Sequence, residues 1–258
     1  MRNSIFAATV FLALSLLISI NVPYAAIPAP VGYWLFDQQG DVILDSSGNE
    51  NHGKIIGKIN WVKGQFGLAV EFSGQEGNYI TIKDSKSLNP KDQLSITCWV
   101  KPASIAGNSR IVSKDDETVG RDYLLVQGDG VIEFGTWHPG GSRSLLDTKP
   151  ALKANEWQHL AGTYDGSRVL VYVNGEEVGQ MNAGKGTADS NVPLVFGYYT
   201  PNVRPEAYNG ILDDVAIFDV ALSPSDIKAI INGELYRKIS AVDPSGKLAV
   251  TWGNIKAR

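Results

Sequence analysis

Six residues have the side-chain types that protein surfaces use to bind sugars, namely aromatic rings and planar polar groups. Each falls near a turn or at the end of an expected strand, and together they are Trp137, His138, Arg143, Tyr198, Tyr199 and Tyr208. An aromatic ring offers a large apolar face beside a polar edge. We expect these residues to form a ligand-binding platform, and ordinary packing inside the fold is the alternative for each of them.

Residues suited to nucleophilic or metal-dependent catalysis are sparse. The histidines are His52, His138 and His159, and His159 lies within an expected strand, where we expect it to pack rather than act as a base. The chain has neither the Gly-x-Ser-x-Gly turn of serine hydrolases nor the His-Glu-x-x-His helix of zinc proteases. The sequence therefore predicts a protein that is not an enzyme.

Charge and cysteine content narrow the possible partners. The chain carries 27 acidic and 23 basic residues, for a net charge of −4, and the basic residues form no cluster. Nucleic acids and anionic membranes select a positive patch, so we expect neither as a partner. Cys98 is the single cysteine, which excludes an internal disulfide, and we expect it to be buried as a small apolar residue.

The N-terminus has the pattern of a secretory signal peptide. Arg2 precedes an apolar stretch over residues 5–20, and the small residues Ala25 and Ala26 follow. This pattern predicts a signal peptide over residues 1–26 and a secreted or cell-surface protein. An uncleaved N-terminal anchor is the alternative, and it is the only association with a membrane that the sequence suggests.

Short alternating runs separated by turns fill most of the remaining chain. Asn174-Gly175 joins the runs 168–173 and 176–180, and Asn-Gly between two such runs is a strong hairpin signal. Other expected strands cover residues 78–83, 94–101, 123–127, 131–137, 156–164, 194–199 and 210–218. Because no long helical pattern intervenes, the sequence predicts an all-β sandwich of antiparallel sheets.

One short helix is expected near the C-terminus. Ser223 suits the N-cap, Pro224 the first helical position and Asp226 a capping box, and the helix ends near residue 232. We therefore expect one domain over residues 27–235. Residues 236–258 are expected to form a tail, with one extra strand at 247–252 as an alternative.

Seven motifs follow one another in order from residue 32 to residue 223. They are 32–37 (GYWLFD), 45–53 (DSSGNENHG), 67–72 (GLAVEF), 95–102 (SITCWVKP), 157–166 (WQHLAGTYDG), 171–175 (VYVNG) and 210–223, which holds GILDDVAIF and then ALS. Together they resemble the laminin G-like (LamG) family of the concanavalin A-like lectin/glucanase superfamily over roughly residues 30–235. The resemblance implies a jelly-roll sandwich of two curved sheets that binds carbohydrate or protein.

Glucanases of the same superfamily carry a Glu-x-Asp-x-x-Glu run that places its carboxylates on one face of a strand. None of the ten glutamates of this chain is followed by an aspartate two positions later. The glucanase motif is therefore absent.

The resemblance also implies a structural calcium ion, because related sandwiches often hold one between an N-terminal loop and a late strand. The matching ligands are Asp37, Asn51, the carbonyl of Gly53, and Asp213. Calcium takes six to eight such oxygen ligands. The alternative is that Asp37, Asp45 and Asp213 only cap turns.

The sequence as a whole predicts a secreted, non-enzymatic module that binds extracellular carbohydrate, with calcium dependence as a further expectation. A protein-adhesion or cell-surface structural module with a surface protein as partner is the first alternative. A glycan hydrolase with an unrecognised site is the second.

Overall fold

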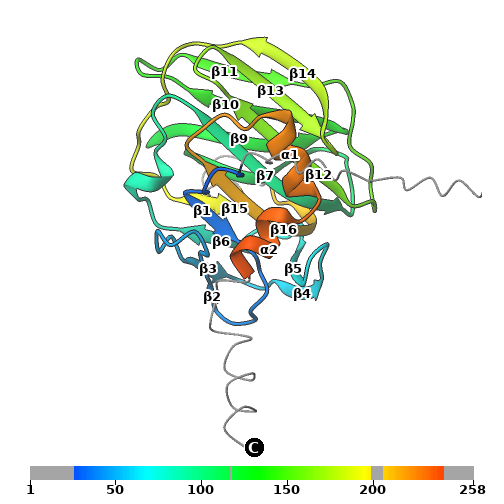
Figure 1. The fold of residues 1–258 in the computed structure, drawn as a ribbon. Helices are drawn as coiled ribbons and strands as arrows, with labels where there is room; N and C mark the ends of the chain where they lie inside the picture. The colour runs from blue at the N-terminus through cyan, green and yellow to red at the C-terminus, as the bar shows by residue number, and fades with distance from the viewer. Residues whose placement is uncertain (1–25, 117, 199–205, 241–258) are drawn as a thin grey trace, which may run out of the picture.

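The chain folds into two antiparallel β-sheets stacked face to face, as Figure 1 shows for a computed structural model that describes residues 26–116, 118–198 and 206–240. The expected jelly-roll sandwich is confirmed. The signal peptide expected over residues 1–26 and the strand expected at 247–252 lie outside the described residues, except for Ala26.

The first sheet, sheet I, has the strand order β14-β13-β12-β7-β16-β5-β4, and β1 pairs with β16 off this path. Its strands are β1 (Gly32–Trp34), β4 (Asn60–Lys63), β5 (Leu68–Ser73), β7 (Leu94–Pro102), β12 (Gln158–Tyr164), β13 (Arg168–Val173), β14 (Glu176–Asn182) and β16 (Asn209–Phe218). The expected Asn174-Gly175 turn joins β13 to β14, and both residues have positive φ, as this type of hairpin requires.

The second sheet, sheet II, has the order β11-β10-β9-β8-β15-β6-β3-β2. Its strands are β2 (Val42–Ile43), β3 (Gly53–Ile56), β6 (Tyr79–Ile82), β8 (Asn108–Asp116), β9 (Gly120–Gly128), β10 (Val131–Trp137), β11 (Arg143–Asp147) and β15 (Leu194–Phe196). A 3-10 turn, Lys86–Leu88, lies in the connection from β6 back to sheet I.

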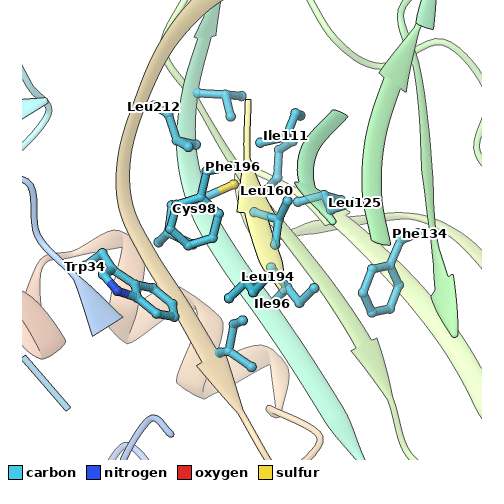
Figure 2. Close-up of a cluster of buried hydrophobic side chains, with 14 of the residues drawn as sticks. Trp34, Ile96, Cys98, Ile111, Leu125, Phe134, Leu160, Leu194, Phe196 and Leu212 are labelled. Carbon is cyan, nitrogen blue, oxygen red and sulfur yellow. The ribbon is translucent and has the colours of Figure 1, made fainter. Parts of the chain in front are cut away.

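The core fills the space between the sheets and follows strand alternation. On β7, Ile96 and Cys98 point inward, and they lie in one cluster with Leu160 of β12 and Leu212 of β16. Phe196 of β15 belongs to the side chains of sheet II that meet them in the core (Figure 2). Cys98 is a free, buried cysteine, as its phase on the strand predicts.

Two short helices cover part of the outer face of sheet I (Figure 1). The first, α1 (Pro224–Ile231), begins with the expected capping box between Ser223 and Asp226. The second, α2 (Glu234–Ser240), occupies the start of the expected tail, and buried Leu235 packs it onto the same face. The folded domain thus extends past residue 235. No helix within the described residues is long and apolar enough to cross a membrane.

At Gly162 of β12 the two sheets pack closely against each other. A Cβ at this residue would overlap the ring of Phe134, which comes from sheet II. We therefore expect Gly162→Val to lower the free energy of unfolding by about 1–3 kcal/mol through overpacking. Guanidinium denaturation measures this loss, and adding Phe134→Leu should recover part of it. If the losses in free energy of unfolding from the two substitutions simply added, the two residues would not interact, and this contact would be contradicted.

Candidate functional site

One end of the sandwich collects long connections from both sheets. The segments 83–93, 138–142, 183–193 and 219–223 all lie there, because β7 and β15 begin at this end while β10 and β16 finish at it. We call it the loop end. Loops carried by a rigid scaffold are common places for binding sites.

The loop end contains a pocket of about 670 Å³, here named the rim pocket. It is lined by Gly120 and Arg121 of β9, Trp137 of β10, the turn 138–141 and the segment 187–190. The volume falls within the range of small-molecule binding sites.

Trp137 forms the aromatic side of the rim pocket. Its ring packs with Leu124 and Val126 on the outer face of sheet II and is 6% exposed. The guanidinium carbon of Arg121 lies 5.2 Å from the centre of the indole ring, within the range of a cation–π contact. Asp115 Oδ1 forms an ion pair with Arg121 Nε at 3.2 Å and so holds the guanidinium in place.

His138 also lines the rim pocket, but its ring is used to hold two loops together. Its Nδ1 lies 2.6 Å from the carbonyl oxygen of Gly186, and its Nε2 lies 2.7 Å from Ser144 Oγ. A carbonyl can only accept, so Nδ1 carries the proton and Nε2 accepts from Ser144. Ser144 Oγ in turn accepts the Gly184 N–H. The imidazole therefore has no ring nitrogen left for a ligand.

The segment 187–190 is fixed before any ligand arrives. Ala188 N donates to Trp137 O at 2.7 Å, and both the N–H and the hydroxyl of Ser190 donate to Asp122. Beneath Asp122 lies Lys114, whose ammonium is 0% exposed and contacts Asp122 at 2.6 Å, Asp84 at 2.9 Å and Ser190 O at 2.7 Å. Burial raises the pKa of Asp122, and Lys114 counteracts that rise.

The six residues of the expected aromatic platform do not come together. Trp137 and His138 line the rim pocket, and exposed Arg143 lies opposite Trp137 on β11. Tyr198 follows the far end of β15 and stacks on Tyr79 at 5.5 Å. Tyr208 is 0% exposed in the core and donates to Ile211 O, so it has no face for a ligand, which corrects that expectation. Tyr199 lies outside the described residues.

The expected calcium ligands are likewise divided. Asp37 and Asp213 both accept backbone N–H groups from the turn at residues 64–68. Asn51 instead bonds to Val31 and to nearby serines, and Gly53 is paired within sheet II. Within the ranges that the structure describes, no group of three or more His, Cys, Asp or Glu residues could hold a metal ion. The hydrogen bonds thus bring Asp37 and Asp213 to one turn and give Asn51 and Gly53 other partners.

A β-bulge in β16 places Asp213 and Asp214 on the same face of the strand. Leu212 and Val215 both belong to the core, so the two residues between them both point to the outer face of sheet I. Asp214 has a φ of +48° and accepts the Tyr33 hydroxyl at 2.8 Å. Among the residues that the structure describes, neither Asp213 Oδ1 nor Asp214 Oδ2 has a hydrogen-bond partner.

Burial of this carboxyl pair affects stability. Asp213 is 0% exposed and Asp214 is 5% exposed. Burial raises the pKa of Asp213 to about 7, and burial together with the neighbouring Asp213 raises the pKa of Asp214 well above its usual range. Both carboxyls thus hold their protons more tightly than an ordinary aspartate does.

These shifts predict how stability changes with pH. The folded state holds the Asp213 proton more tightly than the unfolded chain, whose aspartates titrate near about 3.9. The stability that the Asp213 proton adds to the folded state is therefore fully present below that pH and is lost as the pH rises through about 7. We expect Asp213→Asn to gain stability relative to the wild type by about 1.4 kcal/mol per pH unit between these limits. Urea denaturation at several pH values measures this, with exposed Asp41→Asn as control. A difference that does not vary with pH would contradict it.

Comparisons with known proteins agree with this fold. The binding domain of Paraclostridial Mosquitocidal Protein 1 matches with a TM-score of 0.65 and 19% identity over 80% of this chain and 52% of that chain. Domain 4 of AbnA, a GH43 extracellular arabinanase from Geobacillus stearothermophilus solved with arabinotriose, matches with a TM-score of 0.60 and 23% identity. The match covers 78% of this chain and 98% of that chain. A structure titled "Cell entry of botulinum neurotoxin type C is dependent upon interaction with two ganglioside molecules" matches with a TM-score of 0.64 and 14% identity. The match covers 80% of this chain and 51% of that chain.

The chain spans about half the length of the two toxin structures and nearly all of the arabinanase domain. At these identities the likeness shows the fold. No curated protein matches the chain. A laminin G family model matches residues 73–228, which is more than half of the sequence. The expected resemblance is confirmed, and the chain belongs to the concanavalin A-like lectin/glucanases superfamily.

Proposed function

We propose that this protein is a non-enzymatic, extracellular module that binds carbohydrate in the rim pocket. The observation that carries the proposal is a pocket of about 670 Å³ that combines the indole of Trp137 with charged and polar groups on a fixed wall. Arg121 supplies hydrogen-bond donors to this pocket and Asp189 supplies acceptors. A sugar needs both, because each hydroxyl group donates and accepts.

The fixed wall favours binding of a small polar ligand. Segment 187–190 is hydrogen-bonded to Trp137, Asp122 and Lys114, so little backbone freedom is lost when a ligand enters. Binding that does not have to order a loop retains more of its contact energy. The arabinotriose in the related arabinanase domain and the gangliosides in the toxin title support carbohydrate as the ligand class.

A surface protein fits the described surface less well than carbohydrate does. Among the residues that the structure describes, the exposed large hydrophobics are Val42, Leu44 and Val119. Protein-docking surfaces are usually built around a buried apolar or aromatic centre. These three side chains do not supply one at the loop end.

Several features support a role without catalysis. The Asp213–Asp214 pair is buried, so a glycan cannot reach it. Burial lowers the pKa of His159 to about 3, which keeps its ring uncharged near neutral pH and makes it a poor base. Secretion rests on the signal-like residues at the N-terminus.

The carbohydrate proposal is tested by titrating the protein with soluble arabinan, xylan, glucomannan, pectin and laminarin. We expect at least one to change the tryptophan fluorescence without release of reducing sugar. Trp137→Phe keeps a ring at the site but removes the indole, and we expect it to weaken binding about tenfold, which equals about 1.4 kcal/mol. Trp61→Phe, on edge strand β4, is the matched control. Failure of every polysaccharide to bind would overturn the proposal.

Calcium dependence is tested separately by thermal unfolding in calcium chloride and in EDTA. Because Asp37 and Asp213 accept backbone N–H groups of one turn while Asn51 and Gly53 have other partners, we expect the same Tm in both solutions. A rise in Tm with calcium that disappears in Asp213→Asn would instead establish the ion at this carboxylate.

A further inference from the structure

A second pocket lies beside the rim pocket at the loop end. It has a volume of about 420 Å³ and is lined by Val31, Asp219 and residues between 86 and 92. Its lining, within the part of the chain that the structure describes, has no aromatic residue and includes the exposed side chains of Lys86, Lys91 and Asp219. We name it the polar pocket.

The two pockets share a wall. Asn89 lines the polar pocket and Asp189 lines the rim pocket, and Asn89 Nδ2 donates to Asp189 Oδ1 at 2.8 Å. Thr187 N donates to Lys91 O at 2.8 Å, and the Thr187 hydroxyl donates to Pro90 O. Segments 89–91 and 187–189 are therefore bonded side by side and form a ridge with one pocket on each flank.

The width of the ridge sets the size of ligand that could use both pockets. Hydrogen-bonded segments lie about 5 Å apart, so a ridge of two segments with their side chains is on the order of 10 Å wide. A single sugar held in the rim pocket does not cross this distance. An oligosaccharide of several units does.

We propose that the rim pocket and the polar pocket are two subsites of one site that takes a stretch of a polysaccharide chain, rather than a single sugar. This inference rests on the proposed carbohydrate function and specifies its ligand class. The rim pocket holds one sugar against Trp137 and Arg121, and the chain then crosses the ridge. In the polar pocket, Lys86 and Lys91 donate to the hydroxyls of the following sugars, and Asp219 accepts from them.

The experiment measures how affinity depends on ligand length. Isothermal titration of the full chain uses the mono-, tri- and hexasaccharide of the polysaccharide that binds most tightly in the panel above. We expect affinity to rise at least tenfold from the monosaccharide to the hexasaccharide. The double variant Lys91→Ala with Asp219→Ala should bind the hexasaccharide about tenfold more weakly than the wild type does. Both side chains are exposed, so an unchanged Tm checks that this double variant still folds.

The matched control is Lys58→Ala with Asp41→Ala, which removes the same two charges from exposed positions away from the loop end, and it should bind all three ligands as the wild type does. Equal affinity for the three lengths, or a hexasaccharide affinity that Lys91→Ala with Asp219→Ala does not change, would overturn the two-subsite inference and leave the carbohydrate function standing. No binding to any polysaccharide of the panel would overturn both.

Discussion

The contact between the inner faces of the two sheets constrains everything else in this protein. Inward-pointing side chains such as Ile96, Cys98 and Leu160 are fully buried, and Gly162 leaves room for the ring of Phe134. The outer face of sheet I is partly closed by α1 and α2 (Figure 1). The loop end carries the long connections and both pockets.

Lys114 links that core architecture to the candidate site. A fully buried ammonium is tolerated only when it is paired and hydrogen-bonded, and Lys114 has Asp84, Asp122 and Ser190 O as partners. These partners come from the β6–β7 connection, β9 and the wall of the rim pocket. Strand β8, which carries Lys114, thus sets the position of segment 187–190. The shape of the rim pocket therefore depends on sheet II as well as on the loops that line it.

Much of the fold could be predicted from the sequence because it depends on local signals. The Asn174-Gly175 turn and the Ser223 capping box are such signals, and both are confirmed. The site residues were harder to predict, because strand phase says which face a side chain is on only while the pairing stays regular. The bulge between Asp213 and Ala216 breaks that rule, and no residue type marks it in advance.

Other features of the site depend on contacts between distant segments. Lys114 lies in a stretch of charged residues that resembles an exposed strand end, yet the structure buries it against Asp84 and Asp122. Tyr208 precedes a strand and looks like a loop residue, but its ring packs against Phe72 in the core. Sequence spacing carries no information about such partners, because Asp84 and Phe72 lie at least thirty residues along the chain from the residues that they contact.

The geometry around Trp137 also decides how a sugar would meet it. One face of the indole packs among Leu124 and Val126, and the Arg121 guanidinium lies over the ring. Arg121 is itself held by Asp115, which Arg110 contacts as well at 3.4 Å. A ligand therefore meets the guanidinium and the edge of the indole instead of an open aromatic face. Such a contact covers little apolar area, so in the two-subsite proposal the affinity comes from several sugars bound in sequence along the loop end.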